Sequence, residues 1–238
     1  MEMRFCLVTG ANRGLGLEFT RQLLARGDRV VATCRHPGKA AALNALAGEY
    51  PGRLHVLPLD VSDPKSIAGL VRELPLLDAG EGEGARLELL VNCAGVLHSG
   101  ERFGSVAAAT LEDSFRTNAM GPLLLTQALA PRLADGARVA NLSSVLGSIA
   151  SVARFGTPSY NLSKAAQNMA TALLAQALQP RGIVVLALHP GWARTDMGGD
   201  NATVPVPDAV AGLLRVIDQA TARDSGSFHD WRGETLPW

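Results

Sequence analysis

The chain is 238 residues long, with 47% hydrophobic and 18% charged residues and a formal net charge of zero. This profile is typical of a globular protein with one substantial core, and we expect a single domain over residues 1–238. Because the charges balance, the composition gives no electrostatic reason to bind nucleic acid or an anionic membrane.

Cysteine usage indicates the redox setting. Cys6, Cys34 and Cys93 are odd in number, far apart and without a CxxC pair. We therefore expect no metal site, no disulfide framework and a reduced, cytoplasmic location. The chain begins with a strand-like run rather than a signal peptide, and no apolar run reaches the roughly 18 residues that span a membrane.

Short apolar runs and helical patterns alternate through the first half of the chain. The runs at 5–8, 29–33, 54–59 and 87–92 are typical of buried strands. Helical patterns extend from the first glycine loop to about residue 26, over 39–47, and onward from Asp63-Pro64, which supply an N-cap and a first-turn proline. Residues 80–85 (GEGEGA) indicate a solvated surface loop.

The same alternation continues to the end of the chain. Helices are expected at 110–133, 159–178 and 208–220, and strands at 138–142, 183–188 and near 227–228. Alternating strands and helices predict an α/β fold with a doubly wound parallel sheet of about seven strands and helices on both faces. Ligands of such folds bind beyond the carboxyl ends of the strands, so functional residues should directly follow the strands.

The segment TGANRGLG (9–16) follows the first strand and opens the first helix. Glycines at this place allow a tight turn and let a phosphate approach the backbone N–H groups of the helix start. The segment therefore predicts a Rossmann-type dinucleotide site, although a glycine triplet alone is often only a turn. The residues expected to contact the cofactor are Gly10, Asn12, Arg13, Gly14, Leu15 and Gly16.

The residues after the second strand favour one dinucleotide over the other. An acidic side chain usually binds the ribose hydroxyls there, but this chain has Cys34-Arg35-His36. Arg35, together with Arg13 in the glycine loop, would pair with a 2′-phosphate, so we expect NADP(H) to be preferred over NAD(H). The alternative is that both arginines are solvated surface residues.

Two further strand ends carry candidate cofactor contacts. Asp60 and Val61 follow the third strand, where a side chain would reach an adenine. Asn92, Ala94 and Gly95 come at the end of the fourth strand, where small residues let the backbone approach a ribose. Taken singly, each is also compatible with ordinary turn chemistry at a strand end.

Seven motifs in a fixed order resemble those of the short-chain dehydrogenase/reductase family over nearly the whole chain. They are TGANRGLG (9–16), LDV (59–61), NCAG (92–95), TNAMG (117–121), NLSS (141–144), YNLSK (160–164) and HPGWART (189–195). Two features depart from the family pattern: Cys93 replaces an asparagine, and the segment from Ser144 to Tyr160 is a few residues longer. HPGWARTDMGG (189–199) and SGSFHDWRGETLPW (225–238) resemble the C-factor/sniffer-like carbonyl reductases.

The resemblance implies the sheet order 3-2-1-4-5-6-7 and the catalytic residues Asn118, Ser144, Tyr160 and Lys164. Tyr160 would give its proton to the alkoxide that forms when a carbonyl is reduced, and Ser144 would orient the same oxygen. Lys164 would bind the nicotinamide ribose, and Asn118 would hold a water for proton return. Ser143 is a rival for the role of Ser144.

The resemblance also implies a nicotinamide contact in the segment after the sixth strand. Thr195 would hold the carboxamide, and Pro190 and Gly191 would shape the loop beside the ring. Trp192 is compatible with a core position or with a cover over the ring and substrate. We expect the segment 193–207, which is rich in Gly, Asp, Asn and Pro, to be a substrate lid, the alternative being an ordered surface connection.

Tyr160 and Lys164 lie four positions apart, so they share a helix face. A free tyrosine has a pKa of about 10, and a neighbouring ammonium stabilises the phenolate and lowers that pKa. An oxidised nicotinamide would add a second positive charge, and a fall in the pKa of about two or three units would bring Tyr160 into the working range of a general acid–base group. Without its context, the pair would be only two neighbours on a helix surface.

The expected function is that of an NADPH-dependent oxidoreductase of the carbonyl reductase or alcohol dehydrogenase type, acting on a small carbonyl or alcohol. The alternative is a dinucleotide-binding signalling or regulatory protein that needs no turnover. The helices at 110–133 and 159–178 are apolar on more than one face and commonly form a two-fold interface in the family. We therefore expect a homodimer or homotetramer, burial within the chain being the alternative.

Overall fold

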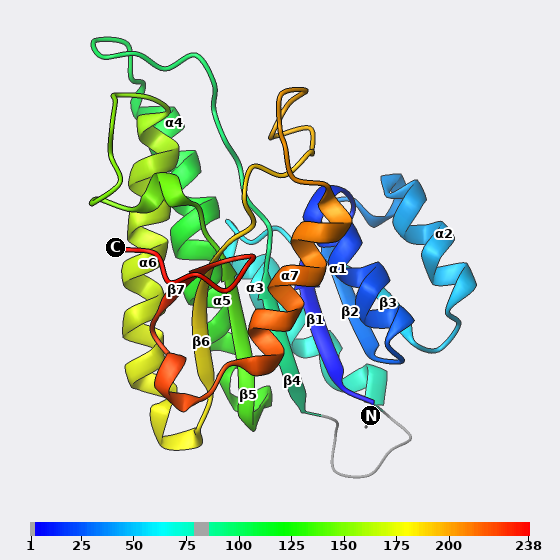
Figure 1. Ribbon diagram of the computed structural model, residues 1–238. Helices are drawn as coiled ribbons and strands as arrows, with labels where there is room; N and C mark the ends of the chain where they lie inside the picture. Colours follow the sequence, from blue (N-terminus) through cyan, green and yellow to red (C-terminus); the bar gives the residue numbers. More distant parts are fainter. Residues whose placement is uncertain (1–2, 79–85) are drawn as a thin grey trace.

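The computed structural model describes residues 3–78 and 86–238, and the seven strands in that part of the chain form one parallel sheet (Figure 1). The strand order is β3-β2-β1-β4-β5-β6-β7, which confirms the expected topology. The expected loop at 80–85 lies outside the described residues. The strands are β1 (Phe5–Thr9), β2 (Arg29–Cys34), β3 (Leu54–Pro58), β4 (Leu87–Asn92), β5 (Leu133–Leu142), β6 (Val184–His189) and β7 (Phe228–Asp230).

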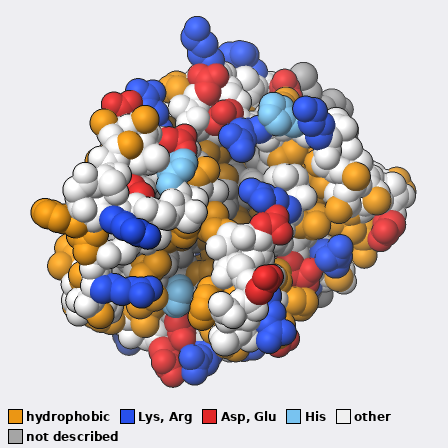
Figure 2. Space-filling model, turned by 90° about the horizontal axis from the view of Figure 1, so that it is seen from above, with side chains coloured by type: hydrophobic (Ala, Val, Ile, Leu, Met, Phe, Trp, Pro, Cys, Tyr) orange, Lys and Arg blue, Asp and Glu red, His pale blue; other side chains and the backbone are white. Residues whose placement is uncertain are grey.

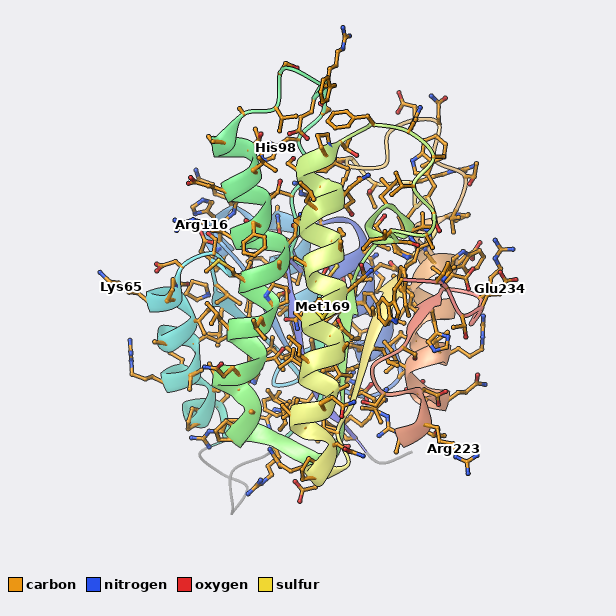
Figure 3. All side chains as sticks on the ribbon, turned by 90° about the vertical axis from the view of Figure 1, so that its left-hand side faces the viewer. Lys65, His98, Arg116, Met169, Arg223 and Glu234 are labelled. Atoms are coloured by element: carbon orange, nitrogen blue, oxygen red, sulfur yellow. The ribbon has the colours of Figure 1, made fainter. Side chains whose placement is uncertain are left out.

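Helices cover both faces of the sheet, as expected (Figure 1). One face carries α1 (Gly14–Ala25), α2 (Ala41–Glu49) and α7 (Val206–Gln219). The other face carries α3 (Pro64–Glu73), α4 (Ala108–Phe115), α5 (Gly121–Leu129) and α6 (Pro158–Leu178). Figure 3 looks onto this second face, where α4 and α6 lie side by side.

The strands are apolar on both sides because both faces of the sheet are covered. Along β1, Phe5 and Leu7 pack on the side of α3, α5 and α6, whereas Cys6 and Val8 pack on the side of α1 and α7. Consecutive side chains of a strand point to opposite faces, so this alternation gives each helical layer its own core.

The start of α3 follows the sequence expectation. Asp63 is the N-cap, and its Oδ1 accepts the backbone N–H of Lys65 at 2.9 Å. Pro64 occupies the first turn, where its missing N–H costs no intrahelical hydrogen bond and its fixed φ suits a helix.

The expected helix at 110–133 is wrong in its middle and at its end. The structure has α4, then a π-helical turn (Arg116–Met120), then α5, and β5 already begins at Leu133. Pro122 has no N–H to bond the carbonyl of Asn118, so the α-helical ladder is interrupted there. Gly121 adds a close contact, because a Cβ at this position would lie 2.8 Å from the carbonyl oxygen of Val61. Neither effect is visible in the apolar periodicity of the sequence.

Three further findings concern the described part of the chain as a whole. None of its helices is long and apolar enough to cross a membrane. It holds no cluster of three or more His, Cys, Asp or Glu side chains arranged to bind a metal ion. The cysteines Cys6, Cys34 and Cys93 are free thiols.

Candidate active site

A cavity of about 930 Å³ lies at the carboxyl end of the sheet, where the loops after β1 to β6 converge. Figure 2 looks down on this end of the molecule, and Lys and Arg side chains lie around its central hollow. The volume is near the upper end of the range of about 300–1,000 Å³ that is usual for ligand and cofactor sites.

Most of the site residues expected from the sequence line this cavity. They are Gly10, Asn12, Arg13, Gly14, Leu15, Gly16, Arg35, Asp60, Val61, Ala94, Gly95, Ser144, Tyr160, Lys164, Pro190, Gly191 and Thr195. Asn92 and Asn118 are buried and do not line it. The ends of six strands, β1 to β6, therefore bring residues that are far apart in sequence to one space.

The glycine loop between β1 and α1 approaches its surroundings at backbone distance. Gly10 has a φ of 65°, and a Cβ there would lie 2.8 Å from Cα of Ala94. A Cβ at Gly16 would overlap the carbonyl oxygen of Gly10. No side chain caps the start of α1, so its first backbone N–H groups stay available to an anion.

The cavity reaches the ends of β2 and β3, where basic side chains gather. Arg35, His36 and Lys39 line this end, and Arg35 and Lys39 are exposed. Asp60, at the end of β3, accepts hydrogen bonds from the backbone N–H and the hydroxyl of Ser62, so its carboxylate is engaged in its own turn. The positive side chains thus meet no carboxylate partner at the end of β2 within the described residues.

Arg13 is placed differently from the expectation of a free second cation. Its guanidinium pairs with Asp196 at 2.9 Å, with both side chains largely exposed. The pair joins the glycine loop to the segment after β6. That segment is itself ordered by hydrogen bonds: Arg194 N–H to Val204 O and Trp192 Nε1–H to Gly198 O.

The catalytic residues expected from the resemblance meet where β5 ends and α6 begins. Tyr160 is buried on α6, forms a hydrogen bond with Ser144 and borders the cavity. Ser144 caps the short turn after β5 by accepting the N–H of Leu146 at 3.1 Å. Ser143, the rival, donates its hydroxyl proton to Asn168 Oδ1 at 2.6 Å. The geometry therefore favours Ser144 as the partner of Tyr160.

The expected lowering of the Tyr160 pKa is wrong for this arrangement. Burial raises the pKa of Tyr160 to about 12, and the hydrogen bond with Ser144 offsets this only in part. Burial also lowers the pKa of Lys164 to about 8. The Lys164 Nζ lies 5.6 Å from the Tyr160 ring centroid and donates to the Leu142 carbonyl at 2.6 Å and to Gln167 Oε1 at 2.9 Å. Desolvation is therefore the largest influence on the pKa of Tyr160.

Asn118 and Asn92 are hydrogen-bonded from behind the cavity. The Asn118 side chain accepts the N–H of Val96 and donates to the Val96 carbonyl and to Ser163 Oγ, all within 2.9 Å. Asn118 sits in the π-helical turn, and these bonds fix the strand end that carries Gly95 and Val96. Asn92 donates to Thr126 and to Asn141, which ties β4 to α5 and β5.

Trp192 and His189 line the cavity at the end of β6, and both are partly exposed. Trp192 borders the cavity with 53% of its surface exposed, which favours the cover over the core position. Burial lowers the pKa of His189 to about 4, so this strand-end imidazole is neutral at physiological pH. His189 is therefore not a general acid at physiological pH.

Comparison with known proteins identifies the family. The pattern of the short chain dehydrogenase family matches residues 4–204. The chain belongs to the short-chain dehydrogenase family. It is 45% identical to the C-signal of Myxococcus xanthus over 154 residues, which cover 64% of this chain and 93% of that protein. Two solved structures align over 100% of both chains with a TM-score of 0.93: an NADPH-bound carbonyl reductase from chicken fatty liver, 37% identical, and the carbonyl reductase Sniffer of D. melanogaster, 31% identical.

Three residues of this short-chain dehydrogenase site were missed by sequence reasoning. Lys39 was detectable, because it follows Arg35 by four positions at the end of β2. Gln167 was detectable in principle, since it lies three positions after Lys164 on the same helix face. Glu101 gave no local signal: its carboxylate accepts the Ser159 hydroxyl at 2.7 Å and so holds the start of α6 from a loop 58 positions away.

Proposed function

We propose that this short-chain dehydrogenase is an NADP(H)-dependent enzyme that reduces small carbonyl compounds or oxidises the matching alcohols. The observation that carries the proposal is that one cavity contains both the glycine loop and the Tyr160–Ser144 pair. A binding protein needs the first feature only. An acid–base group hydrogen-bonded to a hydroxyl that borders the same space suits proton transfer to a substrate oxygen.

The residues present fit a dinucleotide. Gly10 and Gly16 allow the tight packing of the glycine loop against Ala94 and against the loop's own backbone, and the uncapped start of α1 offers N–H donors to a pyrophosphate. Ala94 and Gly95 form a small-residue wall at the end of β4. The glycine loop would hold the phosphates, and Pro190, Gly191 and Thr195 would border the nicotinamide.

Arg35 supports a preference for NADP(H) over NAD(H). It is exposed at the cavity end beside His36 and Lys39, and residues 34–36 contain no carboxylate. A guanidinium forms charge-assisted hydrogen bonds with a phosphate, and these bonds are stronger than its hydrogen bonds with a neutral ribose hydroxyl. Because Arg13 is paired with Asp196, Arg35 and Lys39 are the stronger candidates for the 2′-phosphate contact.

In the reduction, the bound nicotinamide would supply the hydride to the carbonyl carbon. Tyr160 donates its proton to the carbonyl oxygen as that oxygen gains charge, and Ser144 donates a hydrogen bond to the same oxygen. A Tyr160 pKa of about 12 keeps the phenol protonated at neutral pH, as a proton donor requires. The ammonium of Lys164 then stabilises the phenolate that is left, since the two groups lie on one side of α6.

The solved relatives support this reading. The chicken protein and the fly protein are both described as carbonyl reductases, and the former binds NADPH. The similarity to C-signal keeps a second candidate function open, in which the protein signals and turnover is not needed. The second candidate predicts NADPH binding without consumption of any carbonyl compound.

A substrate screen tests the proposal. Wild-type protein is mixed with NADPH or NADH and with a panel of aldehydes, diketones and quinones, and oxidation of the cofactor is followed by absorbance. We expect turnover of at least one carbonyl class, with NADPH preferred. Tight binding of NADPH with no turnover on the whole panel would instead favour the signalling function.

We also propose that two copies associate through the outer faces of α4 and α6. Leu162, Met169 and Leu173 are exposed apolar residues on α6, with 60%, 62% and 59% of their surfaces exposed, so burial within the chain does not explain their apolar character. Met169 lies on the outer face of α6 (Figure 3). Met169→Glu should convert the oligomer to monomers in sedimentation velocity, whereas Lys65→Glu on α3 should not. A monomeric wild type, or an unchanged Met169→Glu, would contradict this assembly.

A further inference from the structure

The side chain of Lys164 points into the protein as well as toward the cavity. Its Nζ donates to the carbonyl of Leu142, the last residue of β5, at 2.6 Å and to Gln167 Oε1 at 2.9 Å. Lys164 is 4% exposed and Gln167 is 0% exposed, so water does not compete for these bonds. The ammonium is therefore held at a fixed place behind the Tyr160 ring.

The number of N–H groups on Lys164 limits the hydrogen bonds that it can form with a ligand in the cavity. An ammonium has three N–H groups and no acceptor. Two are directed to Leu142 and Gln167, and one is left. Gly95, which lines the cavity, lies near the ammonium, since a Cβ at Gly95 would be 3.9 Å from Nζ. Gln167 thus decides how many N–H groups Lys164 offers to a ligand.

Only one end of the Gln167 amide can form a hydrogen bond with the Lys164 ammonium. Only its oxygen accepts hydrogen bonds, so the oxygen must face the ammonium. Its Nε2 is buried without a hydrogen-bond partner in the described part of the chain. A buried donor without a partner costs free energy, and a leucine of similar size would avoid that cost. The benefit that offsets it is the bond to Lys164.

The helix fixes Gln167 in this position. Thr171 Oγ1 donates to the backbone carbonyl of Gln167 at 2.9 Å and accepts from Asn141 on β5, also at 2.9 Å. Asn141 in turn accepts from Asn92 on β4 at 2.8 Å. A buried polar chain therefore runs from β4 through β5 to α6 and supports the residue that holds Lys164.

We propose that Gln167 is a positioning residue that keeps the Lys164 ammonium charged and holds it against the end of β5, leaving one N–H for the bound ligand. The proposal rests on the proposed function of the site. Burial lowers the pKa of Lys164 to about 8, so its charge is close to being lost at physiological pH. The titratable groups that face it are Cys93 after β4, whose pKa is raised to about 12 by burial, and Tyr160 on α6. A neutral acceptor at hydrogen-bond distance favours the charged form.

The direct test is a titration of Lys164 in the cofactor-free protein. The chain has only three lysines, and Lys39 and Lys65 are exposed. Carbon-13-labelled lysine therefore gives three resolvable side-chain signals, of which the one with the lowest titration midpoint belongs to Lys164. Gln167→Leu should lower this midpoint by about one pH unit, as expected for loss of a hydrogen bond to a charged group. Gln167→Glu should raise it.

Gln176→Leu is the matched control, because Gln176 is exposed on the same helix. It should leave the Lys164 midpoint unchanged. A Gln167→Leu midpoint equal to that of the wild type would overturn the proposal. If that variant does not fold, the near-isosteric Gln167→Glu decides alone, and an unchanged midpoint there would also overturn it.

Activity gives the second readout. The ratio kcat/KM for carbonyl reduction should fall as pH rises through about 8 in the wild type, because the ammonium is lost. In Gln167→Leu the fall should occur about one pH unit lower. Absence of any wild-type turnover would contradict the proposed function but not the role of Gln167, which the titration still measures. Turnover with an identical pH profile in both proteins would overturn the role of Gln167 alone.

Discussion

At the β1 end of the cavity the walls are mainly backbone, whereas at the β5 and β6 end they are side chains. Gly10, Gly14 and Gly16 leave main-chain atoms as the surface of the first end. Tyr160, Ser144 and Lys164 supply the chemistry of the second end, beside a loop with the exposed apolar side chains of Leu146 and Val152.

The difference reflects what each end has to recognise. A pyrophosphate is the same in every dinucleotide, so fixed N–H groups of one loop suffice. Different carbonyl compounds differ in shape, and loops over a rigid scaffold accommodate such variation. Leu146 and Val152 line this end of the cavity and are 44% and 61% exposed, which indicates a substrate side that is not closed by the fold itself. The three predictions below separate the two ends.

The largest effect is expected at the side-chain end. Ser144→Ala removes the hydroxyl that bonds Tyr160 and the substrate oxygen, and it should reduce kcat by about a hundredfold to a thousandfold. Binding of NADPH, measured by fluorescence, should stay within about threefold of the wild type. A larger loss of kcat in Ser143→Ala would assign the role to the rival serine instead.

A smaller but different loss is expected at the backbone end. The Cβ of Gly16→Ala would meet the carbonyl oxygen of Gly10, so the loop must shift. Overpacking of this kind costs about 1–3 kcal/mol, which corresponds to a roughly tenfold to hundredfold weaker binding of NADPH. Gly48→Ala on α2 is the control, since its Cβ has open space. Equal NADPH affinity in Gly16→Ala and Gly48→Ala would contradict the role of the glycine loop in binding the cofactor.

The smallest effect is expected at the end of β2, beyond the glycine loop. Arg35→Asp replaces the cation that would pair with a 2′-phosphate by a carboxylate that repels it. The ratio of NADPH to NADH efficiency should fall by about tenfold, with kcat for the better cofactor little changed. Arg13→Ala should move this ratio less, because Arg13 is already paired with Asp196. An unmoved ratio in Arg35→Asp would contradict the assignment.

Much of the fold was predictable because its signals are local. The apolar runs of β1, β2 and β4 are bounded by turns, and the N-cap at Asp63 is recognisable from adjacent residues alone. The break between α4 and α5 was not predictable from periodicity, because it depends on the missing N–H of Pro122 and on contact of Gly121 with Val61. Tertiary contact overrides the repeat at that point.

The candidate site divides in the same way. The glycine loop and the Tyr160–Lys164 spacing are local patterns, and they line one cavity as expected. The pairing of Arg13 with Asp196 spans 183 positions, so no local pattern contains it. The direction of the Tyr160 pKa depends on burial by several elements, which outweighs the single charge visible in the sequence.

The measurement that tests the central claim most directly compares NADPH binding and carbonyl turnover in Tyr160→Phe. The chain's other tyrosine provides the control variant Tyr50→Phe, which lies outside the cavity. We predict that Tyr160→Phe binds NADPH with near wild-type affinity but loses about a hundredfold to ten-thousandfold in kcat, while Tyr50→Phe keeps both. Turnover in Tyr160→Phe equal to that of the wild type would contradict the role of Tyr160 as proton donor.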